Sequence, residues 1–394
     1  MINNREKKYW LAWSNIKGLG ATSIRKIAQT FDSLETAWGV SSQQLLTVDG
    51  IGKKISETID QQRRKINPDA LFEEHIQKNP FFWCPNDNLY PHLLSEIPSP
   101  PTILYYKGKV VEKENNGITP MIGIVGTRKP TEHGRRWTYN ISKALAQQGF
   151  IIVSGLAEGI DTVAHRACLD VGGRTIAVLG NGLDRAYPLS NRDLMAEIAE
   201  KGLILTEYAH GSRPERGNFP ARNRIVAGLC RAVLVMEAPE KSGALITAHY
   251  ATEFNRDVYT LPNTPDNFRA RGCLRLIHKG AEIIVTTEEL LSSLGAIPNL
   301  DQPEQLSLFT ENGQGFRNDT KTGIPTLAKP EEPNLTPPLS IVYGAIAPEP
   351  TSLDTIVITT KMPMAQVSGI LLQLELDGHI SQLPGMKYKK TMDN

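Results

Sequence analysis

Glycine, hydroxyl and cationic side chains follow an apolar run within residues 121–136, MIGIVGTRKPTEHGRR. The run ends at Gly126-Thr127-Arg128, and a helical pattern follows over about residues 131–148. A loop between a buried strand and a helix lies at the carboxyl edge of an α/β sheet, where such sheets bind ligands. The helix N-terminus presents unpaired N–H groups and partial positive charge, to which Arg128 and Lys129 add. The stretch predicts either a phosphate site or a strand followed by ordinary solvated charges.

Similar residues follow the other strands that we expect in this region. They are Ser154 and Gly155, the run Gly180-Asn181-Gly182, and the run Lys241-Ser242-Gly243. In a parallel sheet these loops share one edge. Glycines leave backbone N–H groups accessible and cations form charge-assisted hydrogen bonds, so this edge suits a ligand that carries phosphates.

A second basic cluster covers residues 213–224, RPERGNFPARNR, just before a predicted helix. Its candidate binding residues are Phe219, Arg222, Asn223 and Arg224. Arginine can fork onto a phosphate or stack on a base, and a phenylalanine ring can stack on an unpaired base. The alternative is a surface loop with solvated arginines.

Glu158, Asp161 and His165 are the best candidates for catalysis, because Asp161 and His165 are four residues apart and share a helical face. The alternative is that the two carboxylates favour a helix N-terminus and His165 packs behind them. The first strand and helix are not joined by GxGxxG, and the chain has no GxxxxGK[ST]. We therefore expect no catalytic residue, no cofactor such as NAD or ATP, and no metal site.

Apolar, β-rich runs alternate with helical patterns over residues 118–296, and most runs are continuously apolar, as expected when helices cover both faces of a sheet. This predicts an α/β fold, an extended Rossmann-like, doubly wound and mostly parallel sheet. The expected strands are Gly123–Val125, Phe150–Val153, Thr175–Leu179, Leu203–Thr206, Ala232–Glu237, Asp257–Leu261 and Glu282–Val285. Residues 80–117 form a connector that contributes two short strands, near 81–83 and 102–106.

Two smaller domains are expected on either side. The pattern of residues 1–79 predicts a helical domain. Within it, Gly18-Leu19-Gly20 and Gly50-Ile51-Gly52 are expected to form helix-hairpin-helix turns, and Lys53 and Lys54 lie at the second turn. Such turns can face DNA phosphate, or the domain can simply pack or bind protein. Residues 297–338 predict a flexible linker, since they are polar and show little periodicity.

Residues 339–394 predict a winged-helix-like module with two helices, near 352–359 and 363–378, and a two-stranded wing. Of its cations, Lys361 precedes the second helix, while Lys387, Lys389 and Lys390 lie in the wing. Because the second helix carries no cation, we expect contact with protein or weak contact with a nucleic-acid backbone rather than reading of the major groove.

Composition limits the class of protein. The 394 residues carry a formal net charge of +1, so any surface for nucleic acid must be local. The four cysteines form no CxxC pair, and we expect Cys168 and Cys230 to be reduced thiols in the protein core. The chain shows neither a signal-type apolar stretch nor a run of 18 apolar residues. We expect a cytoplasmic protein that does not insert into a membrane.

Four motifs together resemble the DNA-processing protein A family, also called DprA or Smf. They are Gly123 to Arg128 (GIVGTR), Val153 to Asp161 (VSGLAEGID) with His165, Phe219 to Ile225 (FPARNRI) and Glu237 to Ala244 (EAPEKSGA). Tyr90-Pro91 and Pro100-Pro101 of the connector also match. The resemblance covers most of the chain.

The resemblance implies a non-enzymatic protein of natural transformation, active in DNA processing and DNA recombination in competence. Such a protein binds and protects incoming single-stranded DNA, loads RecA recombinase onto it, and forms a homodimer through its Rossmann-like domain. The resemblance and the strand-end loops together predict one set of DNA contacts. The set is Gly126, Thr127, Arg128, Ser154, Gly155, Phe219, Arg222, Asn223, Arg224, Lys241, Ser242 and Gly243.

The chain departs from the family pattern near the end of the sheet domain. Asn263 replaces a glycine and Leu274 replaces an asparagine, although Arg269, Arg271 and Arg275 could supply phosphate contacts instead. The competing function is a Rossmann-type nucleotide-processing enzyme similar to phosphoribohydrolases. Such enzymes carry a PGGxGTxxE loop, whereas the corresponding loop here, at 238–244, lacks that glutamate.

Overall fold

The computed structural model describes residues 4–295, 337–347, 351–376, 379–383 and 387–390. The chain forms two compact units, Met1–Leu306 and Ser307–Asn394. The predicted linker over 297–338 lies almost wholly outside the described residues. The other predicted domain limits stay predictions.

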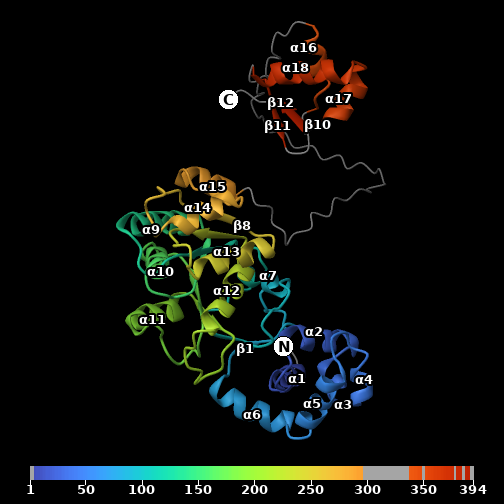
Figure 1. The fold of residues 1–394 in the computed structure, drawn as a ribbon, viewed down its shortest axis with the longest axis vertical. Helices are drawn as coiled ribbons and strands as arrows, with labels where there is room; N and C mark the ends of the chain where they lie inside the picture. Colours follow the sequence, from blue (N-terminus) through green and yellow to red (C-terminus); the bar gives the residue numbers. More distant parts are fainter. Residues whose placement is uncertain (1–3, 296–336, 348–350, 377–378, 384–386, 391–394) are drawn as a thin grey trace, which may run out of the picture. The chain divides into compact units, whose positions relative to one another are not determined.

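The first unit contains a nine-stranded sheet in the order β1-β2-β6-β5-β4-β3-β7-β8-β9 (Figure 1). β3 to β9 run parallel, whereas β1 and β2 are antiparallel additions at one side. The strands are β1 Phe82–Trp83, β2 Leu104–Gly108, β3 Met121–Val125, β4 Ile151–Ser154, β5 Thr175–Leu179, β6 Leu203–Thr206, β7 Ala232–Val235, β8 Asp257–Thr260 and β9 Glu282–Ile283. The predicted fold class is confirmed, and the expected strands differ from these mainly by one or two residues at their ends.

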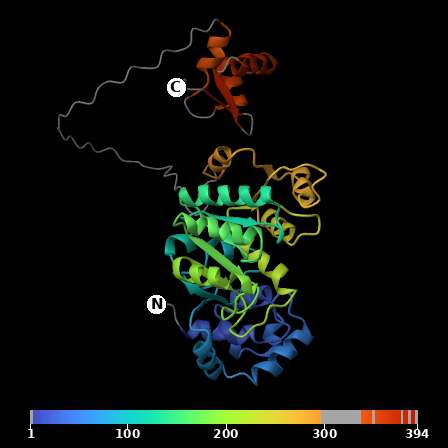
Figure 2. The ribbon, with the colours of Figure 1, turned by 90° about the vertical axis from the view of Figure 1, so that its left-hand side faces the viewer.

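Helices cover both faces of the sheet, which is why the central parallel strands are buried and mostly apolar, whereas β8 and β9 towards the edge are partly exposed. α9, α10, α11 and α15 pack on one face, and α7, α12, α13 and α14 on the other (Figure 1). α9 and α10 lie side by side (Figure 2). The helices of this part are α7 His92–Ser95, α8 Glu112–Asn115, α9 Glu132–Gln147, α10 Ile160–Asp170, the 3-10 turn Leu189–Asn191, α11 Arg192–Lys201, α12 Asn218–Leu229, α13 Ala244–Glu253, α14 Arg271–His278 and α15 Thr287–Gly295.

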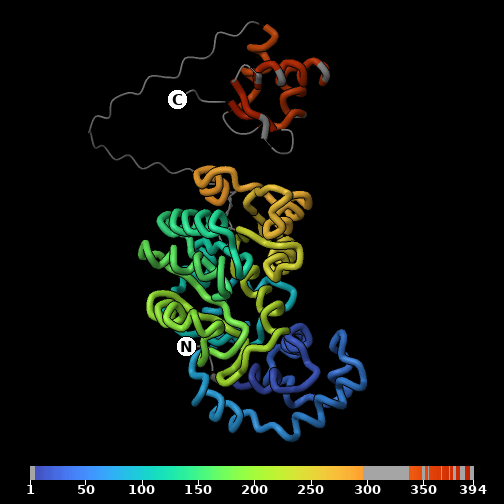
Figure 3. Tube along the Cα trace, turned by 60° about the vertical axis from the view of Figure 1, so that its left-hand side comes forward, coloured from blue at the N-terminus to red at the C-terminus, as the bar shows by residue number. Residues whose placement is uncertain are grey.

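Six helices precede the sheet and gather at one end of the first unit (Figure 3). They are α1 Asn4–Ser14, α2 Ala21–Thr30, α3 Leu34–Gly39, α4 Ser42–Leu45, α5 Lys53–Arg63 and α6 Pro68–Lys78. Gly18 and Gly50 adopt φ values of +90° and +85°, which favour glycine, and Gly20 and Gly52 cap α2 and α5. The two predicted turns are therefore present, while their contact with DNA stays a prediction.

The second unit has a core of its own, built from Val342, Ile356, Leu371 and Tyr388 among others. Its elements are α16 Leu339–Gly344, β10 Thr351–Ser352, α17 Leu353–Thr360, α18 Met364–Leu376, β11 Ile380–Leu383 and β12 Lys387–Lys390. β12 pairs with both β10 and β11. The predicted winged-helix arrangement is present, and the structure adds a third helix, α16, and a third strand, β10, that precedes α17.

All four cysteines are buried and free, as predicted for Cys168 and Cys230. No helix in the described ranges is long and apolar enough to cross a lipid bilayer.

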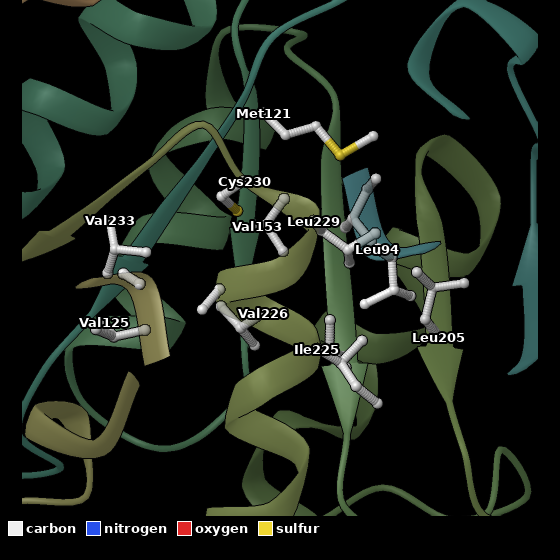
Figure 4. Packing of buried hydrophobic residues seen from close by; sticks show 14 of the residues in the cluster. Leu94, Met121, Val125, Val153, Leu205, Ile225, Val226, Leu229, Cys230 and Val233 are labelled. Atoms are coloured by element: carbon white, nitrogen blue, oxygen red, sulfur yellow. The ribbon is translucent and has the colours of Figure 1, made fainter. Parts of the chain in front are cut away.

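One core cluster holds α12 against the sheet. Ile225, Val226 and Leu229 face strands that carry Val153 and Leu205 (Figure 4). Because α12 also carries Phe219 and Arg222, this packing sets where the candidate binding residues lie.

Shortening Ile225, which is 0% exposed, should therefore be costly. We expect Ile225→Ala to lower the free energy of unfolding by about 2–5 kcal/mol, because a cavity forms that the sheet cannot fill. Val285→Ala is the matched control, since Val285 is 62% exposed, and should change it by less than about 0.5 kcal/mol. Urea denaturation measures both, and equal effects would contradict this account of α12.

Candidate nucleic-acid interface

A cavity of about 910 Å³ opens at the carboxyl edge of the sheet. It lies where β3 and β7 are neighbours, the point at which the strand order reverses and at which open α/β sheets bind ligands. We call it the main hollow. Its lining residues include Gly126, Thr127, Arg128, Lys129, Asp161, Tyr187, Arg216, Phe219, Arg222, Asn223, Ser242, Gly243, Phe268 and Arg269.

The loop after β3 is fixed by the end of β7. The N–H of Thr127 donates to the carbonyl of Glu237 at 2.7 Å. The buried carboxylate of Glu237 in turn accepts from the N–H of Thr131 at 3.1 Å and from its hydroxyl at 2.7 Å. A side chain at Gly126 would approach Cγ1 of Ile160 to 2.5 Å and the Glu237 carbonyl to 2.9 Å. Glycine is required there because the loop passes directly over α10 and β7.

Thr131 also caps α9, because its hydroxyl accepts from the N–H of Gly134 at 3.1 Å. This confirms the helix start predicted near that residue. Arg128, which is predicted to bind phosphate, is an exposed residue of this loop.

Arg128 and two aromatic rings make the hollow suitable for a base as well as for phosphate. The guanidinium carbon of Arg128 lies 5.8 Å from the ring centroid of Phe219. The ring of Tyr187 lies 5.2 Å from that of Phe219, tilted by 32°. A side chain at Gly180 would approach the Phe219 ring to 2.8 Å, so the loop after β5 makes room for this ring.

Arg222 lies beneath the hollow. It is 4% exposed, and its guanidinium donates to the carbonyl of Val178 in β5. The same guanidinium fills the space that a side chain at Gly155 would need. Burial lowers the pKa of Arg222 to about 10, so it remains charged at neutral pH. Its position indicates that Arg222 supports the floor of the hollow from beneath. Its direct contact with DNA stays a prediction.

Ser154 and Arg224 lie outside the lining of the main hollow, and their contact with DNA stays a prediction. Ser154 is 0% exposed, and its hydroxyl donates to the carbonyl of Ile124 at 2.6 Å. The guanidinium of Arg224 forks onto the carboxylate of Glu207, with two hydrogen bonds of 2.7 Å, and donates to the carbonyl of Ser99. Both side chains are thus committed to the fold and line no part of the main hollow.

The remaining predicted residues differ in how they are placed. The side-chain amide of Asn223 donates to the carbonyl of Gly243 at 3.0 Å, which joins α12 to the turn before α13. Lys241 is exposed on that turn but is not part of the lining, so its contact with a ligand stays a prediction. Gly155 lines a neighbouring cavity of about 250 Å³, which we call the middle hollow and which shares Arg128, Tyr187, Phe219 and Arg222 with the main one.

Of the three arginines near the departures at Asn263 and Leu274, only Arg269 lines the main hollow. Arg271 donates to the carbonyl of Pro265 at 3.1 Å, and Arg275 pairs with Glu240 at 2.9 Å. Tyr187 and Phe268 are lining residues that sequence patterns did not reveal. Both are exposed aromatic residues in loops. The sequence alone gives no reason to assign either residue to this site.

Of the three candidate catalytic residues, Asp161 and His165 are held in structural contacts, whereas Glu158 is exposed and lines the middle hollow. Asp161 accepts from the N–H groups of Gly155 and Ala157 at 3.1 and 3.3 Å, and burial raises its pKa despite nearby Arg222. Nδ1 of His165 lies 2.7 Å from the Thr175 hydroxyl. Within the described part of the chain, Asp161 and His165 share no hydrogen bond or ion pair, although they are four residues apart. Among the described residues, no group of three or more His, Cys, Asp or Glu side chains is placed to hold a metal ion.

Comparison with known proteins supports one family. The family model described as DNA recombination-mediator protein A matches residues 81–295, and that described as DprA winged helix domain matches residues 326–386. Protein Smf of Synechocystis sp. is 54% identical over 397 residues, covering 98% of this chain and 99% of that protein. DNA processing protein DprA of Streptococcus pneumoniae is 42% identical over 224 residues, covering 57% of this chain and 77% of that protein. The X-ray structure of that pneumococcal protein has a TM-score of 0.64 at 35% identity, covering 74% of this chain and 98% of the other.

Two glycines that line the main hollow should respond differently to alanine. We expect Gly126→Ala to destabilise the protein by about 1–3 kcal/mol, because the added methyl group collides with backbone and with Ile160. Gly243→Ala is the control, since a side chain there meets nothing within 4 Å. Thermal denaturation of both variants measures this, and a neutral Gly126→Ala would show that the loop is not held in the way described.

His165 should make the protein sensitive to acid. Burial lowers the pKa of His165 to about 3 in the folded state, whereas the pKa of a histidine in the unfolded state is about 6.5. Between these values the unfolded state binds more protons, so the free energy of unfolding falls as the pH drops through this window, by up to about 1.4 kcal/mol per pH unit.

We expect His165→Gln to flatten this slope in urea denaturation between about pH 7 and pH 5. His133→Gln, which replaces an exposed histidine, should leave the slope unchanged. An identical slope in wild type and His165→Gln would contradict the assignment of a buried, neutral imidazole.

Proposed function

Since the chain belongs to the DNA recombination-mediator protein A family, we propose that it binds single-stranded DNA in the main hollow at the carboxyl edge of its sheet. In this proposal it acts in natural transformation, protects the incoming strand and loads RecA recombinase onto it. It forms a homodimer through the Rossmann-like sheet domain and works in the cytoplasm without catalysing a reaction.

One observation carries the proposal: Arg128 lies over the ring of Phe219, which lies against Tyr187, within a cavity of about 910 Å³. A cation beside two aromatic rings suits a phosphate and an unpaired base together. In a duplex the bases are already stacked on one another and paired, so the rings are useful only for a single strand. Arg216, Arg269 and Lys129, which also line the cavity, supply further positive charge along it.

Asp161 and Glu237 are held in structural contacts, which supports binding rather than hydrolysis, although Glu158 is exposed beside the middle hollow. Asp161 is held by backbone N–H groups, and Glu237 is buried against Thr131. A phosphoribohydrolase-like enzyme needs a carboxylate that is free to act on the sugar. Release of free base from nucleoside monophosphates by the purified protein would favour that alternative.

The affinity for single-stranded DNA should depend steeply on salt. With about five cations on phosphates, log K should fall with log salt at a slope of about −3.5. Fluorescence anisotropy with single-stranded and duplex oligonucleotides of the same length measures this. A flat response, or tighter binding of the duplex, would contradict the proposal.

Arg128→Ala should reduce the magnitude of that slope by about 0.7, because one phosphate contact is lost. Phe219→Ala should weaken binding by about ten-fold or more with the slope unchanged, because a stacked base is lost and no charge is removed. The control is Phe81→Ala, since Phe81 is 58% exposed and lines neither hollow. Unchanged affinity in both Arg128→Ala and Phe219→Ala would place the DNA elsewhere.

A further inference from the structure

A third cavity, of about 340 Å³, lies between α11 and the pair β2–β6. We call it the side hollow. One face of α11 forms its wall through Arg192, Met195 and Ala199, and Lys107 of β2 lies opposite. Lys107 is the register partner of Ile204 in β6, so the rigid sheet sets its position.

The side hollow continues the path that begins in the main hollow. It shares Ala186 and Leu189 with the middle hollow, which in turn shares Arg128 and Phe219 with the main hollow. Leu189, at the junction, is 75% exposed. An exposed leucine between the middle and side hollows offers an apolar surface to a base or sugar while the phosphates on either side reach the cations of the main and side hollows.

The charges in the side hollow are not equally available. Arg185 lies 3.5 Å from the carboxylate of Asp184, which also accepts from the N–H of Gly211 at 2.8 Å. Lys107 and Arg192 are both exposed, and within the described part of the chain no ion pair joins either of them to a carboxylate. These two cations are therefore the ones that a ligand can use.

The middle hollow is less suited to phosphate. Glu158 lines it, and the carboxylate of Glu158 accepts from the hydroxyl of Ser190 at 3.4 Å. A strand that crosses this hollow would place its bases there and its phosphates at the two cationic ends. The alternation of cations, apolar surface and cations matches the alternation of phosphate and base along a single strand.

We infer that the side hollow is a second phosphate-binding subsite, at which Lys107 and Arg192 hold the same DNA strand after it leaves the main hollow. The inference rests on the proposed function and extends it by giving the strand a path across the protein. The path runs from the β3–β7 edge over Leu189 toward α11. It applies only to strands that are long enough to reach both hollows.

The test compares oligothymidylates of about 6 and about 20 nucleotides on the full chain. The variant Lys107→Gln with Arg192→Gln should bind the long strand about ten-fold more weakly and reduce the magnitude of its salt slope by about 1.4, the value for two lost phosphate contacts on a single strand. Its affinity for the short strand should equal that of wild type. An unchanged affinity and slope with the long strand would overturn the inference.

Two further variants make the result decisive. Lys113→Gln removes an exposed cation of α8 that lines none of the three hollows, and it should behave as wild type with both strands. Arg128→Ala should weaken binding of both strands. If Arg128→Ala has no effect on either length, the proposed function itself fails; if it weakens both while the double glutamine variant binds the long strand as wild type does, only the second subsite fails.

Discussion

The carboxyl edge of the sheet depends on one buried cation, Arg222. Its guanidinium donates to the carbonyl of Val178 in β5 and fills the space above Gly155, so it joins α12 to two neighbouring strands. Burying a charge is costly unless opposite charge and hydrogen bonds compensate, and here Asp161 supplies the opposite charge. Because Phe219 precedes Arg222 by one helical turn, fixing the arginine also fixes the ring that faces the hollow.

A second contact completes this edge from the other side. Glu237, at the end of β7, holds the loop after β3 through Thr127 and Thr131. The two loops diverge because the chain continues from β3 toward β4 in one direction and from β7 toward β8 in the other. The hollow is thus a consequence of strand order, and the small residues at its rim leave it open.

Much of this could be predicted from the sequence because the signals are local. Continuous apolar runs located most of the parallel strands, and Gly126 to Arg128 marked the edge of the sheet at which the main hollow lies. Burial of a charged side chain could not be predicted in this way. Arg222 and Arg224 look equivalent in FPARNR, yet one lies under the hollow and the other pairs with Glu207. The two arginines differ because Arg222 lies on the side of α12 that faces the sheet. Arg224 lies near the carboxylate of Glu207, which only the fold brings close to it. Tyr187 was missed for the same reason, since its contact with Phe219 is made only in three dimensions.

The central claim is that a single strand lies on the rings of Phe219 and Tyr187 beside Arg128. Photo-crosslinking tests it most directly: a single-stranded oligonucleotide that carries a photoreactive thymine analogue is irradiated with the full chain, and the crosslinked peptides are identified by mass spectrometry. The account predicts crosslinks in the peptides that contain Phe219 or Tyr187, and their loss when unlabelled single strand competes. Crosslinks confined to the turns at Gly18 and Gly50, or to residues 339–390, would contradict it.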